Sequence, residues 1–114
     1  CIRDRSGSDL FTGTLDLLIL RTVRAEPLHG YGVGKALRDG SEGVLAVEEG
    51  ALYPALHRLE RRGLLESAWG KTDTGRRAKF YRLTEEGDAH LSAESRRWAA
   101  FSGAVATILG EGRS

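Results

Sequence analysis

Apolar residues recur along the chain with helical spacing in four segments and form two short strand-like runs. A dense apolar run over residues 15–23 predicts a buried first helix over about residues 14–25. Pro27 and Gly30 then interrupt the helical pattern. A second, shorter helix is predicted over about residues 31–39, before a loop.

The third predicted helix, over residues 50–62, has two different faces. Leu52, Leu56 and Leu59 fall at i, i+4 and i+7, which places them on one core-facing stripe. Gly63 follows the last turn and favours the end of the helix there. The other side of the helix carries polar and basic residues, namely Tyr53, His57, Arg58, Arg61 and Arg62.

The spacing changes after this helix. Residues 64–69 and 78–83 are β-compatible runs that contain three aromatic residues. The connection between them is polar, basic and bears glycines, so the segment predicts a β-hairpin. A hairpin alone is marginal in water, and this one must therefore rest on the helices.

The last predicted helix runs over residues 84–109, with Thr84 as its capping hydroxyl and acids in its first turn. At about 1.5 Å per residue such a helix extends ~37 Å, which reaches past a small domain. Its apolar stripe either packs on its own domain or pairs with a second copy, and we favour the dimer. The predicted dimerisation residues are Leu91, Trp98, Phe101, Val105 and Ile108.

The order of elements predicts a mainly α fold with a two-stranded β wing: a winged helix-turn-helix followed by a C-terminal dimerisation helix. In such folds the helix after the turn enters the major groove of DNA. The predicted division is a disordered or tag-like segment over residues 1–12, a DNA-binding domain over 13–83, the dimerisation helix over 84–110, and a tail over 111–114.

The charge distribution supports this fold assignment. The 114 residues carry 17 basic and 16 acidic side chains, yet residues 57–82 hold eight bases and three acids, leaving nine bases and thirteen acids elsewhere. A basic face attracts phosphate through counterion release. The alternative is a solvated surface with ion pairs along the helix.

Other classes of function find little support in the sequence. The lone Cys1 cannot form an internal disulfide and no apolar run could span a bilayer, so a cytoplasmic protein is expected. The histidines lack metal-ligand spacing, and Lys35 stands where a dinucleotide fingerprint needs its third glycine. The sequence also lacks the nucleophile elbow that would expose a catalytic serine. We therefore expect no enzyme activity, no metal and no cofactor.

Four motif runs carry a family resemblance: His29-Gly30-Tyr31, Gly50-Ala51-Leu52-Tyr53-Pro54-Ala55-Leu56-His57-Arg58-Leu59-Glu60, Gly63-Leu64-Leu65 and Tyr81-Arg82-Leu83-Thr84-Glu85-Glu86-Gly87. Together they resemble the PadR family of bacterial transcriptional regulators over about residues 13–109. The single terminal helix is similar to that of the short-tailed subgroup. The resemblance implies a homodimeric repressor that binds palindromic operator DNA and releases it when an effector binds.

The candidate DNA-binding residues lie on the third helix and the wing. Tyr53 could instead pack against the wing, and Arg58 and Arg61 could instead pair with Glu60 or Glu66. Ala51 stands where members often have Thr or Ser, which removes one hydroxyl from the phosphate-facing segment. The candidates are Tyr53, Pro54, His57, Arg58, Arg61, Lys71, Arg76, Arg77 and Lys79.

Three further expectations concern partners. Trp98 is either a core anchor or part of an aromatic slot for a hydrophobic or phenolic effector, as the resemblance implies. His29 is expected to cap or bridge elements. Glu60 is expected to orient a neighbouring Arg or a helix end and not to read cytosine. The alternative function is a winged-helix module that binds a protein partner through the same basic face.

Overall fold

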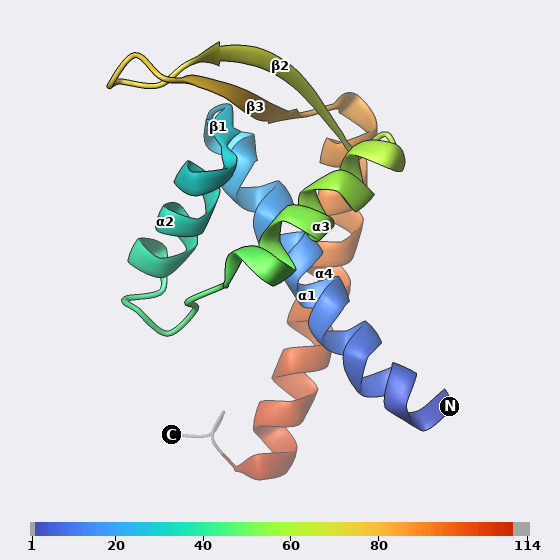
Figure 1. The fold of residues 1–114 in the computed structure, drawn as a ribbon. Coiled ribbons are helices and arrows are strands. Elements are labelled where there is room, and N and C mark those ends of the chain that lie inside the picture. The colour runs from blue at the N-terminus through green and yellow to red at the C-terminus, as the bar shows by residue number, and fades with distance from the viewer. Residues whose placement is uncertain (1, 111–114) are drawn as a thin grey trace.

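The chain forms four helices and one three-stranded sheet. The computed structural model describes the backbone of residues 2–110 and the side chains of residues 13–110. The sheet lies across one end of the helices, while α4 runs down and beyond them (Figure 1). The elements are α1 Ile2–Ala25, β1 Leu28–His29, α2 Gly30–Gly40, α3 Glu49–Arg61, β2 Leu65–Lys71, β3 Arg77–Leu83 and α4 Glu85–Leu109.

The predicted winged helix-turn-helix with a long terminal helix is confirmed, with two differences in the elements. Helix α1 begins at Ile2 and not near residue 14. No proline interrupts residues 2–13, so nothing covalent prevents helical hydrogen bonding there. Cys1, the side chains of residues 2–12, and the predicted tail 111–114 lie outside the described part of the chain.

The second difference is the short strand β1, where the sequence predicted only an interruption. Leu28 pairs with Tyr81 and His29 pairs with Phe80, in a sheet of order β1-β3-β2. Pro27 ends the helical pattern just before this strand, and β3 offers a free edge to pair with. The His29 ring also lies 5.2 Å from the Phe80 ring, which confirms the bridging expectation; its side chain makes no capping hydrogen bond.

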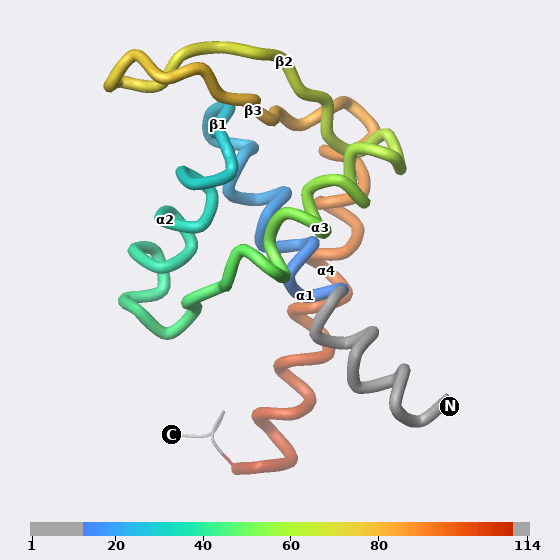
Figure 2. Tube along the Cα trace, viewed as in Figure 1, coloured from blue at the N-terminus to red at the C-terminus, as the bar shows by residue number. Residues whose placement is uncertain are grey.

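The core lies where α1, α2 and α3 meet the inner face of the sheet. Its fully buried side chains include those of Ile19 and Leu20 from α1 and of Leu56 and Leu59 from α3. The trace in Figure 2 shows α3 and α1 crossing at the centre of the domain. The leucine stripe predicted for the third helix is therefore the side that packs inward.

Two glycines allow motif runs that are distant in the sequence to pack closely against each other. A Cβ on Gly30 would overlap the ring of Tyr53, so α2 and α3 approach closely only with glycine there. A Cβ on Gly87 would overlap the carbonyl oxygen of Leu64, which sets how α4 leaves the sheet. Each motif run thus fits against another run that is distant in sequence.

The start of α4 is fixed by Thr84. Its hydroxyl accepts a hydrogen bond from the Gly87 N–H at 2.9 Å, which confirms the predicted cap. The same hydroxyl donates to the Gly63 carbonyl oxygen at 2.7 Å. Gly63 itself has φ +80°, a left-handed conformation that ends α3. None of the helices within residues 2–110 has a stretch long and apolar enough to cross a membrane.

Candidate nucleic-acid interface

The outer side of α3 presents one exposed stripe. Gly50, Pro54, His57 and Arg61 follow one another at i, i+4, i+7 and i+11, and all four are exposed. They lie opposite the buried leucines, because an α-helix places residues of this spacing on one side. The stripe combines an imidazole and a guanidinium, which can both donate hydrogen bonds to DNA.

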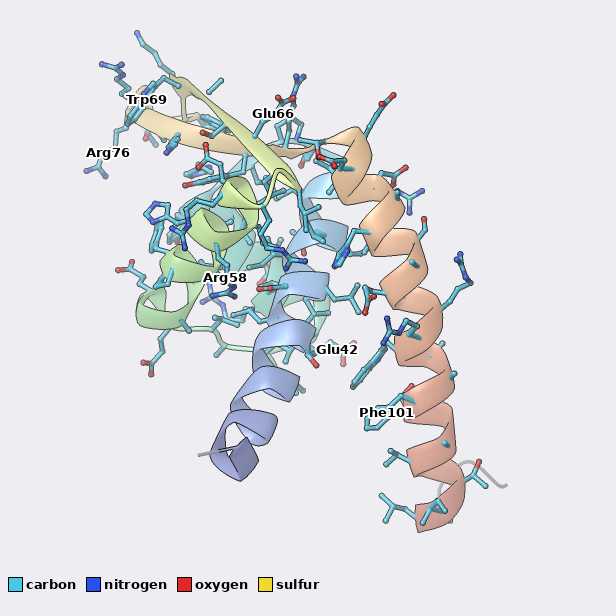
Figure 3. All side chains as sticks on the ribbon, turned by 90° about the vertical axis from the view of Figure 1, so that its right-hand side faces the viewer. Glu42, Arg58, Glu66, Trp69, Arg76 and Phe101 are labelled. Carbon is cyan, nitrogen blue, oxygen red and sulfur yellow. The ribbon has the colours of Figure 1, made fainter. Side chains whose placement is uncertain are left out.

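Arg58 lies on the flank of α3 and is held inside the domain. Its guanidinium binds the carboxylate of Asp16 on α1, with Nη2 2.5 Å from Oδ1. Arg62 approaches the other oxygen of Asp16 at 3.8 Å. Asp16 is only 7% exposed, so these two arginines neutralise a buried charge. Figure 3 shows Arg58 between α3 and α1, where its ion pair with Asp16 fixes α3. A third of the Arg58 side chain is exposed, and its contact with DNA stays a prediction.

Tyr53 is half-buried and packs against the core beside Gly30. The ring lies against Gly30 of α2. Tyr53 is also close enough to the wing strand β3 that, after burial and Glu60, it helps to raise the pKa of Tyr81. Tyr53 precedes the exposed Pro54 in α3 and keeps intermediate exposure. Tyr53 therefore closes the gap between α2 and α3 at the border of the candidate interface.

The wing tip carries three exposed cations, Lys71, Arg76 and Arg77. The turn is hydrogen-bonded: the Thr72 N–H donates to the Arg76 carbonyl oxygen at 2.8 Å, and Gly75 adopts φ +85°. The Arg77 guanidinium lies 4.6 Å from the centre of the Trp69 ring, a cation–π contact. Figure 3 shows this end of the hairpin projecting from the domain, with Trp69 and Arg76 near the tip.

Lys79 differs from the other cations of the wing because it faces α3. Its ammonium lies 3.6 Å from Glu60 and 5.8 Å from the Tyr81 ring. Glu60 also accepts a hydrogen bond from the Ser67 hydroxyl at 2.6 Å. Glu60 therefore contacts Lys79 of β3 and Ser67 of β2, and not the neighbouring arginine or helix end that the sequence predicted. Burial raises the pKa of the Tyr81 hydroxyl beneath this pair.

A groove between α2 and the wing tip contains residues that the sequence did not suggest. It has a volume of about 600 Å³ and is lined by Tyr31 and Lys35 of α2, facing Arg76 and Arg77. Lys35 donates a hydrogen bond to Asp39 at 2.8 Å. This contact raises the pKa of Lys35 and lowers that of Asp39, so both groups are charged at neutral pH. The only signal in the sequence was a Tyr and a Lys four residues apart, on one side of a short helix.

The apolar stripe of α4 divides into a buried part and an exposed part. Leu91 is 1% exposed and belongs to the core of its own chain, so its predicted role in dimerisation is corrected. Trp98, Phe101, Val105 and Ile108 lie farther along the helix and are all exposed, at 39% for Trp98 and 84% for Ile108. Figure 3 shows Phe101 on the part of α4 that stands away from the domain.

A hollow of about 290 Å³ lies between α1 and α4. Its apolar side is formed by Leu17, Trp98 and Phe101, and its polar edge by Glu94 and Arg97. The rings of Trp98 and Phe101 are 5.7 Å apart and tilted by 39°. The hollow has the mixture of aromatic walls and few polar groups that small organic ligands require. Over the described residues, no group of three or more His, Cys, Asp or Glu side chains could hold a metal ion.

Comparison with known proteins identifies the family. The model of the Transcriptional regulator PadR-like family matches residues 19–93. A transcriptional regulator of Mycobacterium tuberculosis is 48% identical over 80 residues, which are 70% of this chain and 71% of the relative. An uncharacterized protein of Lysinibacillus sphaericus is 32% identical over 92 residues, or 81% of this chain and 84% of that protein.

Solved structures agree with this match. A PadR-like transcription factor from Bacteroides fragilis has a TM-score of 0.75 and 29% identity, covering 91% of this chain and 98% of the other. A PadR family regulator from Eggerthella lenta has a TM-score of 0.73 and 34% identity, covering 95% and 92%. The family model covers the core, α3 and the wing, and the similar structures extend over α4. This chain therefore belongs to the PadR-like family of transcriptional regulators.

Proposed function

We propose that the protein is a homodimeric transcriptional repressor that binds palindromic operator DNA through α3 and the wing and is released by a small-molecule effector. The single observation that carries the DNA-binding part is the exposed stripe of Pro54, His57 and Arg61, backed by buried leucines. A major groove about 12 Å wide admits one such helix, with its apolar side docked on the domain and its polar side toward the bases.

The wing would contact the phosphates next to the groove that α3 enters. Lys71, Arg76 and Arg77 are exposed at its tip. Cations in this position bind DNA of any sequence and give the complex its affinity and salt dependence. Pro54, His57 and Arg61 would then determine which sequence is preferred.

The exposed apolar stripe of α4 supports a homodimer. Trp98, Phe101, Val105 and Ile108 recur on one side of a helix that extends beyond its own domain (Figure 1). A second copy that covers this stripe would bury apolar area on both chains. A twofold dimer places two α3 helices on half-sites about one helical turn apart, which is why a palindromic operator is proposed.

The hollow beside Trp98 is the candidate effector site. Aromatic walls from Trp98 and Phe101 suit a hydrophobic or phenolic molecule, while Glu94 and Arg97 could orient its polar groups. The site lies against α1, and α1 holds α3 through the pair of Asp16 and Arg58. A ligand that shifts α1 would therefore shift α3, which gives a physical route from binding to release.

The first experiment isolates the genomic DNA fragments that the protein enriches and measures binding to them over a range of salt. Contacts to about six phosphates give a steep fall of affinity with salt. A flat salt response on the enriched duplexes would contradict DNA binding and favour the protein-interaction module. Reporter expression from an enriched fragment, with and without the protein, distinguishes repression from activation.

Phe101→Asp tests the dimer. A carboxylate in the middle of the apolar stripe would be desolvated by a second copy, so it should weaken association by at least ~2 kcal/mol. Sedimentation velocity should show the parent chain as a dimer and the variant as a monomer of unchanged helical content. The matched control is Ser95→Asp on exposed α4, which should leave the mass unchanged. A parent chain that sediments as a monomer contradicts the proposed homodimer.

A further inference from the structure

Three hollows follow one another along one side of α4. The first has a volume of about 170 Å³ and lies between α1, α4 and the end of α3. The second is the hollow beside Trp98, and the third, of about 240 Å³, lies along the second half of α4. Gly13, Leu17 and Glu94 line both of the first two hollows, and Phe101 lines both of the last two. The hollows therefore form one groove, here called the α4 groove.

The side chains that α4 contributes to this groove lie on one side of the helix. His90, Arg97, Phe101 and Ile108 follow one another at i, i+7, i+11 and i+18. Figure 3 shows Phe101 pointing from α4 toward the side on which α1 lies. From His90 to Val105 the helix rises ~22 Å. At about 1.2 Å per bond, an extended alkyl chain of about 16 carbons has nearly this length.

The end of the groove between α1 and α3 has more positive than negative charge. Its two carboxylates are already paired, Asp16 with Arg58 and Glu94 with Arg97. Arg62 is held only weakly, because its Nη1 lies 3.8 Å from Asp16 and its side chain is 48% exposed. The Arg62 guanidinium is therefore the surplus charge at this end, and it is free to bind a further anion.

His90 adds a second donor beside Arg62. Its imidazole lines the same hollow and forms no hydrogen bond or ion pair with any residue that the structure describes. A carboxylate accepts hydrogen bonds from a guanidinium and from an imidazole N–H. The other end of the groove is lined only by apolar side chains, those of Phe101, Ala104, Val105, Ile108 and Leu109. One end of the groove thus suits a single anionic group, and the other suits a long apolar chain.

We propose that the α4 groove binds a long-chain fatty acid, with its carboxylate at Arg62 and His90 and its alkyl chain along the exposed apolar stripe of α4. The inference rests on the proposed function and deepens it, because it assigns a chemical class to the effector. A longer chain buries more apolar area, so the affinity increases with chain length until the groove is filled. A single aromatic ring would fill only the middle hollow.

Binding of the fatty acid and formation of the homodimer exclude each other. The alkyl chain and the second copy cover the same side chains of α4, beginning at Phe101. A ligand that binds only the single chain lowers the fraction of dimer by mass action. A single chain carries one α3 helix and makes half of the contacts with a palindromic operator. The fatty acid therefore releases the operator by separating the two copies.

The binding test titrates the full chain with hexadecanoate, below its micelle concentration, in an isothermal calorimeter. Hexadecanoate should bind saturably, and decanoate should bind more weakly by at least ~10-fold, because fewer methylene groups are buried. Hexadecyltrimethylammonium has the same chain length and the opposite charge, and it should also bind more weakly by at least ~10-fold.

The variants test where the carboxylate lies. Arg62→Gln and His90→Gln should each weaken the binding of hexadecanoate severalfold, because each removes one donor to the carboxylate. Arg96→Gln is the matched control, since it removes an exposed cation from another side of α4, and it should leave the affinity unchanged.

Two further measurements test the effector role. Saturating hexadecanoate should convert the dimer to a single chain in sedimentation velocity. It should also weaken binding of the parent chain to an enriched genomic duplex by at least ~10-fold. Both effects should need a higher concentration of hexadecanoate with Arg62→Gln than with Arg96→Gln.

The outcomes separate this inference from the function on which it rests. If the parent chain dimerises and binds DNA but does not bind hexadecanoate, the fatty-acid site is refuted and the proposed DNA binding stands. Equal affinity for hexadecanoate and for the ammonium amphiphile would mean that either one merely coats the apolar stripe, and it overturns the inference. Saturable binding that leaves the dimer and its DNA affinity unchanged refutes the effector role. A parent chain that binds no duplex refutes the proposed function and, with it, the effector role.

Discussion

Helices α3 and α4 both carry an apolar stripe at helical spacing, but the two stripes differ in how far they are buried within the chain. In α3, Leu52, Leu56 and Leu59 are all essentially buried. In α4, exposure rises along the helix from 1% at Leu91 to 84% at Ile108. The spacing of the residues is equally regular in both helices, so spacing alone does not decide whether a stripe packs within its own chain.

The length and position of the two helices account for this difference in burial. Helix α3 has 13 residues and lies wholly over the core, whereas α4 has 25 residues and leaves the domain after its first turns. Figure 1 shows its second half extending beyond the other helices. The stripe of α3 therefore stabilises the fold of one chain, and the exposed half of α4 is available to a second copy or a ligand.

The largest expected effect comes from truncating one leucine of the α3 stripe. Leu56→Ala should lower the free energy of unfolding by ~2–5 kcal/mol, because it leaves a cavity in a closely packed core. Ile108→Ala on the exposed half of α4 is the control and should change the unfolding of one chain by less than ~0.5 kcal/mol. Urea denaturation at low protein concentration measures both. Equal losses would mean that the two stripes do not differ as described.

Most of the fold could be predicted from the sequence because its signals are local. The leucine spacing fixed the inner side of α3, and Thr84 and Gly63 marked where α4 begins and α3 ends. β1 was missed because a strand of two residues has no periodicity of its own. It exists because β3 has an edge to pair with, and that edge is a property of the assembled sheet.

A second, smaller effect concerns how α1 holds the two helices. It contacts α3 through the buried pair of Asp16 and Arg58, and α4 through the exposed pair of Arg24 and Asp88 at 3.4 Å. Asp16→Asn should cost about 2–3 kcal/mol of unfolding free energy, since it leaves Arg58 without its countercharge. This loss of unfolding free energy is smaller than for a fully buried ion pair, because the Arg58 side chain keeps some contact with water.

Asp88→Asn is the matched control, because it removes one carboxylate from α4 in the same way. Both members of its ion pair, Arg24 and Asp88, are about half exposed, so the free energy of unfolding should change by no more than ~0.5 kcal/mol. Thermal or urea unfolding of the two variants gives the comparison. A loss for Asp88→Asn as large as that for Asp16→Asn would show that burial does not distinguish the two contacts.

The surroundings of the candidate DNA-binding residues could be predicted only in part, for a physical reason. Pro54, His57 and Arg61 follow from the side of α3 opposite the leucines, and the structure exposes all three. The ion pair of Arg58 was missed, because its partner Asp16 is 42 residues away in the sequence. The one available signal was a single acid inside the apolar run of α1, since a buried carboxylate requires a cation.

The smallest expected effect compares one exposed cation on each helix. Arg61→Ala on α3 should weaken binding to an enriched genomic duplex by ~1–3 kcal/mol if Arg61 contacts a base edge, and its loss on random duplex should be smaller. Arg96→Ala on α4 should leave both affinities unchanged, because that side of α4 lies away from the interface. Anisotropy titrations of the two variants on both duplexes measure the difference. Equal weakening by Arg61→Ala on both duplexes would assign Arg61 to a phosphate, and the reading of sequence would then rest on His57 and Pro54 alone.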